Sequence, residues 1–193
     1  MTQQKDKIKQ PPYAILRGGY KYKETLGMRR VTTYCMDIVE AKDVLYVLIR
    51  ADGSGGNIRR INWKDEDLDV FGNFKWPVQM IQDSEGRLFV SDEGDHCVHS
   101  LVDDGEKGYV PIGQTAEAQE SSTKTQKIGE YGSGDGQLDS PSGIAFDSDE
   151  NILVVDTGNN RVQKFSRDGK FIKTIISGDG EGALNMPWGI AVN

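Results

Sequence analysis

The stretch Pro141–Phe165, PSGIAFDSDENILVVDTGNNRVQKF, decides how this chain folds, because it occurs more than once. Pro77–Leu101, PVQMIQDSEGRLFVSDEGDHCVHSL, aligns with it without a gap at a spacing of 64 residues. Gly132–Asp147 likewise aligns with Gly178–Asn193, and eight of the sixteen residues are identical. A weaker copy begins near Tyr34. Internal repetition of this kind predicts a repeat architecture.

The spacing between the copies is typical of the blades of a β-propeller. The copies begin 43, 64 and 46 residues apart, and the longest interval contains a polar segment, Gln114–Tyr131. This segment has no apolar periodicity and is predicted to be a surface loop. Without it the period is about 44 residues, within the range of about 40–50 for a propeller blade.

Four short strands are predicted within each copy. Ile152–Val155 is a continuous apolar run, which indicates a strand buried on both faces. Asp168-Gly169 predicts a hairpin turn, and Phe171–Ile175 alternates apolar and polar residues, as expected for an outer strand. The predicted strands are 142–147, 151–156, 161–166 and 170–176, with equivalents 64 residues earlier and almost no helix.

The pattern P-x-G-I-A-F-D, V-V-D-T-G-N-N-R-V-Q-K-F and D-G-K-F resembles an NHL repeat, with Pro141–Ile175 as the clearest copy. The resemblance implies an all-β fold, a partial β-propeller of NHL-type four-stranded blades with about three blades and the start of a fourth. We expect a disordered N-terminal tail at 1–12 and an incomplete propeller domain at 13–193, with repeats near 31–74, 75–113, 132–177 and 178–193 and an inserted loop at 114–131.

NHL propellers resemble six-bladed rings, and the number of copies here falls short of six. The last copy stops at Asn193 inside its first strand, and the predicted strand Tyr13–Tyr22 has no blade of its own. We therefore expect the natural protein to continue past Asn193, and the full-length ring to be a monomer. The fragment alone is expected to aggregate or to unfold without cooperativity, because an open array leaves a sheet face bare.

Composition narrows the classes of partner. The chain is 36% hydrophobic and 27% charged, with a net charge of −7, which disfavours nucleic acid. Met1–Gln10 is not followed by an apolar signal segment, and no stretch is long enough to span a bilayer. A cytoplasmic protein without membrane contact is expected, with Cys35 and Cys97 as reduced thiols.

Two histidines lie among acidic residues after the second strand of the second copy; the group is His96, His99, Asp92, Glu93 and Asp95. Imidazole and carboxylate groups suit zinc or iron. His96, however, occupies the slot of Asn160 in the next copy, and Asp92 occupies that of Asp156. Turn-forming repeat positions explain both better, so no metal and no cofactor are predicted.

Other motifs also have structural explanations. Asp147–Asn151 opens like a calcium loop, but the glycine and the bidentate glutamate that such a loop needs are missing. Gly132–Gly136 lacks the Lys-Ser/Thr of a phosphate loop. Cys97 and His96 are adjacent in a strand, so they point to opposite faces and do not form a nucleophile–base pair. No catalytic residue is therefore predicted.

One enzymatic alternative follows from the family resemblance. Peptidyl-hydroxyglycine amidating lyase resembles an NHL propeller in which three histidines hold zinc, each directly after the proline that opens a blade. The matching positions here are Cys35, Val78, Ser142 and Trp188, and none is histidine. Lyase chemistry is therefore the weaker hypothesis.

A second alternative is an RNA-binding domain similar to the NHL propellers of tripartite-motif proteins. The local basic clusters are Arg29-Arg30, Arg59-Arg60 and Lys21 with Lys23, inside an acidic chain. Solvated strand edges explain them better. Two cysteines are also too few for the zinc spacing of a RING or B-box.

The default for this fold is a non-catalytic scaffold whose loops bind a protein or a small ligand. In a four-stranded blade, the connection before the first strand and the turn between strands two and three lie at the same rim. Large aromatic residues dominate interface energetics, which makes this rim the predicted contact surface, although Trp188 could equally pack between blades. The candidates are Trp76, Val78, Glu93, Asp95, His96, Asn159, Asn160 and Trp188.

Overall fold

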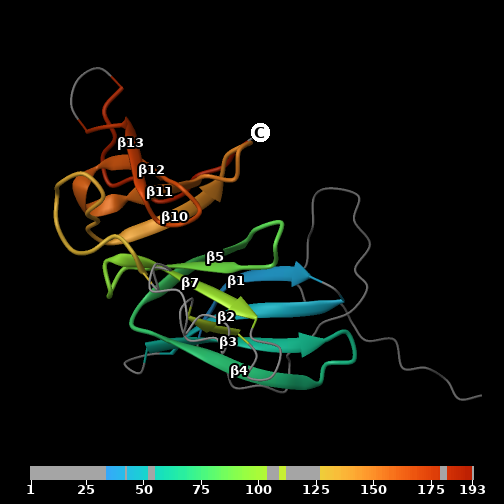
Figure 1. Ribbon diagram of the computed structural model, residues 1–193. Helices are drawn as coiled ribbons and strands as arrows, with labels where there is room; N and C mark the ends of the chain where they lie inside the picture. Colours follow the sequence, from blue (N-terminus) through green and yellow to red (C-terminus); the bar gives the residue numbers. More distant parts are fainter. Residues whose placement is uncertain are drawn as a thin grey trace, which may run out of the picture. The chain divides into compact units, whose positions relative to one another are not determined.

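The computed structural model describes residues 34–41, 43–51, 55–103, 109–111, 127–178 and 182–192. All of them belong to one compact unit, Val31–Asn193 (Figure 1). The described residues form three antiparallel sheets, and their only helix is a three-residue 3-10 turn at Thr157–Asn159. The all-β, partial-propeller fold is therefore confirmed. The predicted tail at 1–12 and the predicted strand Tyr13–Tyr22 lie outside the described residues.

The first sheet, here called blade one, has the strand order β1-β2-β3-β4. Its strands are β1 (Tyr34–Ala41), β2 (Val44–Ala51), β3 (Gly55–Asn62) and β4 (Asp67–Phe74). Each strand pairs with the next along the chain, and Leu48 of β2 faces Ile58 of β3 in the register. This meander is the arrangement expected of a propeller blade.

The third sheet, here called blade three, has the same order, β10-β11-β12-β13. Its strands are β10 (Pro141–Phe146), β11 (Ile152–Asp156), β12 (Arg161–Phe165) and β13 (Phe171–Ile176). Every strand end lies within one residue of its prediction. The agreement follows from the turns: Asp147 and Ser166 each close a tight turn by backbone hydrogen bonds at the predicted positions.

The second sheet, here called blade two, differs at its outer edge. Its strands are β5 (Pro77–Gln82), β6 (Leu88–Asp92), β7 (Cys97–Asp103), β8 (Tyr109–Pro111) and β9 (Lys127–Ile128). Both β8 and β9 pair with β7, β8 with Leu101–Asp103 and β9 with Val98 and His99. Two short pieces thus share the place that β13 fills alone in blade three.

This split edge corrects the predicted inserted loop at 114–131. Lys127 and Ile128 belong to the sheet, and Ile128 is only 1% exposed because it packs in the core between blades two and three. Tyr131 also forms a bridge with Leu138. The insertion therefore interrupts an outer strand rather than separating two blades. Two apolar positions inside a polar segment were too short a signal to show this.

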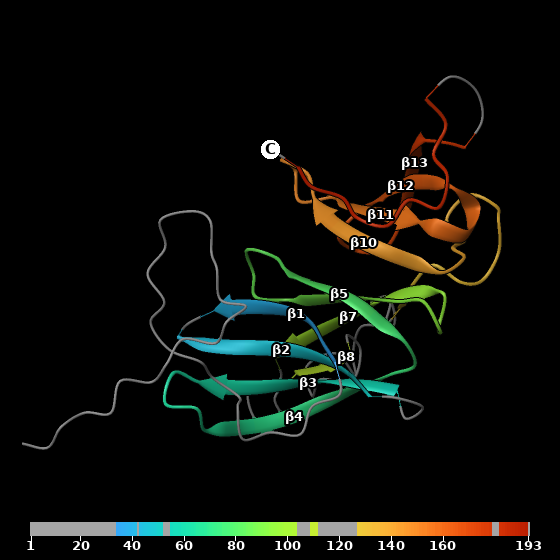
Figure 2. The same cartoon turned by 180° about the vertical axis from the view of Figure 1, so that it is seen from behind.

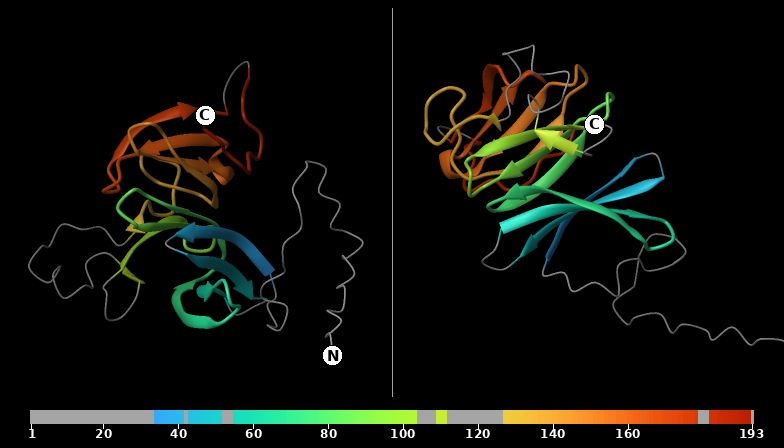
Figure 3. Two further views of the ribbon diagram at one scale, coloured as in Figure 1. Left: turned by 90° about the vertical axis from the view of Figure 1, so that its right-hand side faces the viewer. Right: turned by 60° about the horizontal axis from the view of Figure 1, so that its bottom comes forward.

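The first strands of the three sheets pack in the order in which they occur in the sequence. Strand β5 lies between β1 and β10 and contacts both (Figure 2). The other strands of each blade follow outward from its first strand (Figure 3). Packing sheet on sheet in this way buries both faces of the middle blade.

Strand β6 shows how that burial works. Leu88 and Val90 belong to the core between blades one and two, together with Leu48 and Ile58. Phe89, between them in the sequence, belongs to the core between blades two and three. Because side chains alternate between the two faces of a strand, a strand between two sheets is apolar at every position. The continuous apolar run of the repeat therefore reflects burial on both sides.

Side chains also link the backbones of neighbouring blades. The Asp37 carboxylate on β1 accepts a hydrogen bond from the Met80 amide on β5, with an N···O distance of 3.0 Å. The Gln79 side-chain oxygen on β5 accepts one from the Ile144 amide on β10, at 2.9 Å. Met80 and Ile144 occupy equivalent positions in their blades, so the same link between first strands occurs twice.

Candidate functional site

The turn between the second and third strands of blade three is built around one buried carboxylate. Asp156 accepts hydrogen bonds from the Asp139 amide at 2.7 Å, from the Asn159 side chain at 2.9 Å and from the Arg161 guanidinium at 2.7 Å. The Gln163 side chain adds a fourth at 3.2 Å. A buried charge is tolerated when it is paired and hydrogen-bonded, and here the guanidinium supplies the counter-charge.

Blade two has a buried aspartate at the same position. Asp92 accepts hydrogen bonds from the backbone amides of Lys75 at 2.8 Å and Trp76 at 2.7 Å, and from those of the turn that follows it. His99 Nε2 lies 3.3 Å from Asp92 Oδ2. Burial alone would raise the pKa of Asp92, but hydrogen bonds from His99 and from these amides hold the pKa below its usual value.

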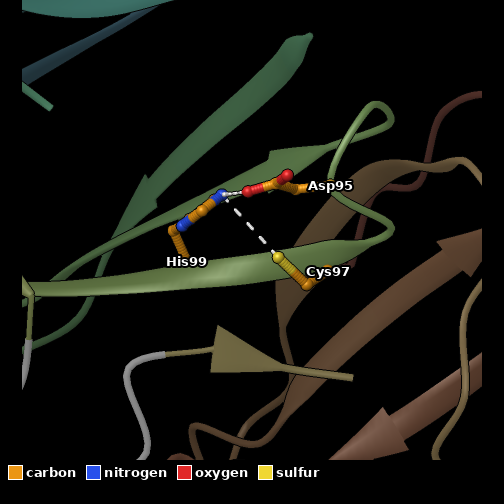
Figure 4. Close-up of side chains that lie close together, drawn as sticks. All are labelled: Asp95, Cys97 and His99. Atoms are coloured by element: carbon orange, nitrogen blue, oxygen red, sulfur yellow. Dashed lines mark hydrogen bonds and ion pairs between the residues drawn. The ribbon is translucent and has the colours of Figure 1, made fainter. Parts of the chain in front are cut away.

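The residues around Asp92 differ from those around Asp156. Asp95, Cys97 and His99 stand where blade three has Asn159, Arg161 and Gln163. Figure 4 shows His99 Nε2 facing the Asp95 carboxylate and the Cys97 thiol, at 3.4 Å and 3.7 Å. Cys97 and His99 are two residues apart on β7 and so share a face. We call Asp95, Cys97 and His99 the β7 cluster.

Two lysines neutralise Asp95. The ammonium groups of Lys75 and Lys127 each lie 2.6 Å from one of its carboxylate oxygens. Burial would raise the pKa of Asp95, but these hydrogen bonds outweigh it and hold the pKa at about 2. Burial raises the pKa of Cys97 to about 12, so its thiol is not a ready nucleophile at neutral pH, despite its nearby imidazole.

The two histidines do not come together, because His96 faces the next blade. His96 is in the left-handed conformation, with φ at 52°, and its Nδ1 accepts a hydrogen bond from the Ser140 amide at 3.1 Å. Asn160 in blade three has φ at 54° and accepts from the Met186 amide at 2.7 Å. Both residues thus anchor the segment that enters the next repeat. Nδ1 can accept only if it carries no proton, which places the ring proton of neutral His96 on Nε2.

Trp76 is the most prominent predicted rim residue. Its side chain is 41% exposed, and the Arg50 guanidinium lies 4.3 Å from the centre of its ring. The same guanidinium lies 6.0 Å from the ring of Tyr34, which is 54% exposed. The Glu93 amide donates to the Trp76 carbonyl at 3.0 Å. Burial raises the pKa of Glu93, although the charge of Arg50 opposes the increase.

Other predicted rim residues are engaged within the fold. Val78 is buried at 7% exposure, so its place in the predicted contact surface is wrong: the first strand turns this side chain inward. Asn159 donates to the Gly132 carbonyl at 2.8 Å as well as to Asp156. Trp188 is exposed, and its carbonyl accepts a hydrogen bond from the buried Ser142 hydroxyl at 2.8 Å.

Several residues that contact the predicted rim residues, directly or through Arg50, or lie close to them in the sequence, were missed from the sequence. They are Tyr34, Arg50, Tyr131 and Met186, of which Tyr34, Tyr131 and Met186 are exposed. The Tyr131 ring packs edge-on against His96, with ring centres 4.7 Å apart. Arg50 could have been found, because the spacing of 43 between the first two copies puts it in the slot of Glu93.

The Arg59-Arg60 cluster is paired with acidic residues on the neighbouring strand. Arg60 donates two hydrogen bonds to Asp69, at 3.0 and 2.7 Å, and Arg59 lies 3.7 Å from Asp67. These pairs cancel much of the positive field that would attract phosphate groups. The other basic clusters lie outside the described residues. In the part of the chain that the structure describes, no helix is long and apolar enough to cross a membrane.

Comparison with known proteins identifies the family of the repeat. The NHL repeat model matches residues 138–165. Protein brain tumor of Drosophila melanogaster is 44% identical over 45 residues, which cover 23% of this chain and 4% of that protein. Protein lin-41 of Caenorhabditis elegans is 51% identical over 45 residues, with the same coverage of 23% and 4%. The match thus spans only a small part of these relatives.

Solved structures extend the likeness of fold to most of this chain. A streptogramin B lyase structure superposes with a TM-score of 0.53 at 14% identity, over 80% of this chain and 43% of that one. A catalytically inactive virginiamycin B lyase from Staphylococcus aureus with quinupristin gives a TM-score of 0.54 at 14% identity, over 80% and 44%. At this identity the likeness concerns the β-propeller fold alone. The repeat match shows that the chain contains an NHL repeat, and the three antiparallel blades together with this likeness show a β-propeller fold.

Proposed function

We propose that this chain is a non-catalytic binding scaffold whose rim receives a protein partner. The carrying observation is the Arg50 guanidinium, which lies 4.3 Å from the ring centre of Trp76 and 6.0 Å from that of Tyr34, two exposed residues. Tryptophan, tyrosine and arginine are the side chains most enriched where protein interfaces gain their energy. We call these three residues the aromatic clamp.

The backbone of Trp76, one of the three clamp residues, is held in place before any partner binds. Asp92 fixes the Trp76 amide at 2.7 Å, and the Trp76 carbonyl accepts from Glu93. Gly94 packs so closely beneath this segment that a Cβ would lie 2.8 Å from the Lys75 Cβ. A side chain on a fixed backbone loses little conformational entropy on binding, which favours affinity.

The contacts on blade three support a continuous rim. Tyr131 is exposed and packs against His96, and Met186 and Trp188 are exposed in the segment that Asn160 anchors. Large exposed apolar side chains gathered along one rim are typical of protein interaction sites. A small ligand would need an enclosed pocket, whereas an exposed row of side chains suits the broader surface of a protein. We therefore favour a protein partner over a small molecule.

A displayed peptide library panned against the 193-residue chain tests this proposal. For the selected peptides, Trp76→Ala should weaken binding by about 30-fold, the loss of about 2 kcal/mol typical of an interface hot spot. Leu68→Ala is the matched control, because Leu68 is also an exposed apolar residue but lies on the outer strand β4. Equal affinities for wild type and Trp76→Ala, or a larger loss with Leu68→Ala, would refute the proposal.

Neither alternative gains support from a specific contact. Three of the positions where an amidating lyase would place histidine have other roles: Val78 is buried, Ser142 is buried and bonded to Trp188, and Cys35 carries an exposed thiol. An RNA-binding face at Arg59-Arg60 would have to break the ion pairs with β4.

A further inference from the structure

Among the residues that the structure describes, blade two has no arginine beside its buried aspartate, unlike blade three. Arg161 contacts Asp156 at 2.7 Å, but Cys97 occupies the equivalent position beside Asp92. The ammonium groups of Lys75 and Lys127 contact Asp95 instead. A buried carboxylate is costly without a positive partner. The substitution of arginine by cysteine thus removes one cation and adds a metal-binding atom at the same place.

Two of the three spacings in the β7 cluster, those from His99 to Cys97 and to Asp95, match the ligands of one tetrahedral zinc ion. Zn–S and Zn–N bonds of about 2.3 and 2.05 Å put sulfur and nitrogen about 3.6 Å apart, and Zn–O bonds put oxygen about 3.4 Å from nitrogen. His99 Nε2 lies 3.7 Å from Cys97 Sγ and 3.4 Å from Asp95 Oδ2. The three ligand atoms all lie within 4.8 Å of one another.

The spacings from His99 to the two carboxylates lie at the long end of the hydrogen-bond range. An N–H···O bond is usually about 2.9 Å between heavy atoms, whereas His99 Nε2 is 3.4 Å from Asp95 and 3.3 Å from Asp92. A single ring proton cannot point at both carboxylates at once. An ion between these groups would satisfy all of them, with Asp92 Oδ2 as the nearest candidate for a fourth ligand.

We propose that Asp95, Cys97 and His99 form a binding site for a divalent transition metal of the zinc type. Imidazole, thiolate and carboxylate are all accepted by Zn²⁺, and thiolate selects it over Mg²⁺ or Ca²⁺. On binding, the Cys97 S–H bond breaks, an S–Zn bond forms, and the proton passes to solvent. Bound metal deprotonates a coordinating thiol even where burial opposes it.

The proposed ion has a structural role. It joins the turn that holds Asp95 to strand β7, and so replaces the link that Arg161 makes in blade three. Lys127 is half-exposed and can leave Asp95 when the metal arrives. His96 takes no part, because it faces Ser140, so this is not the His96–His99 site weighed from the sequence.

The chain provides its own controls, because it contains only two cysteines and two histidines. The double variant Cys35→Ser/His96→Asn removes the cysteine and the histidine outside the cluster. The double variant Cys97→Arg/His99→Gln replaces two ligands by the residues that blade three has at the equivalent positions, Arg161 and Gln163. Both variants should retain the far-UV circular dichroism of the wild-type chain.

Each protein is titrated with Zn²⁺ against a fluorescent chelator, and with Co²⁺ by visible absorption. We expect one equivalent of Zn²⁺, and the visible and thiolate charge-transfer bands of tetrahedral Co²⁺, in the wild type and in Cys35→Ser/His96→Asn. Both signals should be lost in Cys97→Arg/His99→Gln. Absence of stoichiometric binding in the wild type, or full binding in Cys97→Arg/His99→Gln, would overturn the proposal and leave the cluster as a hydrogen-bonded group.

Discussion

Replacing Gln79 by methionine tests how the blades are joined. Methionine keeps the length and bulk of the side chain but removes the oxygen that accepts a hydrogen bond from the Ile144 amide at 2.9 Å. Ile144 is buried, which limits the access of water to the position of that oxygen. Gln79→Glu is the matched variant, because it keeps an acceptor at the same position, as Asp37 does one blade earlier.

The loss of stability in Gln79→Met follows from the Ile144 amide, which would be left without an acceptor. Leaving a buried donor without a partner costs about 1–3 kcal/mol, more than the net worth of the bond itself. In a folded unit of this size, about 2 kcal/mol lowers the melting temperature by about 4–8 °C. Gln79→Glu should lose less than half of that. The effect is confined to one junction, because Asp37 and Met80 make the other link independently.

Hydrogen exchange measures the opening free energy at the Ile144 amide without requiring the chain to unfold in one cooperative step, and urea unfolding followed by tryptophan fluorescence reports the accompanying loss of stability. We expect the exchange of that amide to accelerate in Gln79→Met far more than that of Met80. If the free energy of unfolding changes by less than about 0.5 kcal/mol while Ile144 keeps its protection, the link between first strands is not a stabilising contact.

Three further outcomes are expected. Although burial would raise the pKa of Asp147, Lys164 helps to hold that pKa at about 2, below the ordinary value of about 3.9. The ion pair therefore stabilises the fold above about pH 4, and this stabilisation is lost as the pH falls towards 2. The difference in stability towards urea between wild type and Lys164→Ala should shrink over that range. Iodoacetamide should label the exposed Cys35 in the native protein and the buried Cys97 only after unfolding, as mass spectrometry would show; native labelling of both would contradict the burial of Cys97. Reversing the Arg59-Arg60 charges to glutamate should leave RNA retention at physiological salt at the nonspecific level of the wild type, and a salt-sensitive, micromolar complex lost on reversal would contradict this.

The strands of blade three were predictable because each lies between turns that the sequence marks. Asp147 and the Asp168-Gly169 pair close tight turns, and Ile152–Val155 carries the apolar run of a strand buried on both faces. Local chemistry and burial agree at every step there. Blade one was fainter in the sequence, but its four strands follow the same order.

The links between blades could not be predicted in the same way. Asp37 and Gln79 each accept a hydrogen bond from the first strand of the next blade, yet they share neither charge nor residue type. Blade three has Gly143 in the slot of Gln79, where an added Cβ would lie 2.8 Å from the Trp188 carbonyl oxygen. In an alignment these three positions hold unrelated residues. What the first two share is the backbone amide of the next blade's first strand, to which each side chain bonds, and this does not show in the residue type.

The β7 cluster was not predicted from the sequence because one residue, Lys127, was assigned to a loop. Alignment of the copies correctly put Asp92 in the slot of Asp156 and Cys97 in the slot of Arg161. The consequence was missed because Lys127, whose ammonium lies 2.6 Å from Asp95, had been placed in a loop. Only the pairing of β9 with β7 brings that charge to the turn. With Lys127 beside the turn, the Asp95 carboxylate has a counter-charge, whereas the Asp92 carboxylate has no arginine next to it among the described residues. The proposed metal ion would supply the missing positive charge.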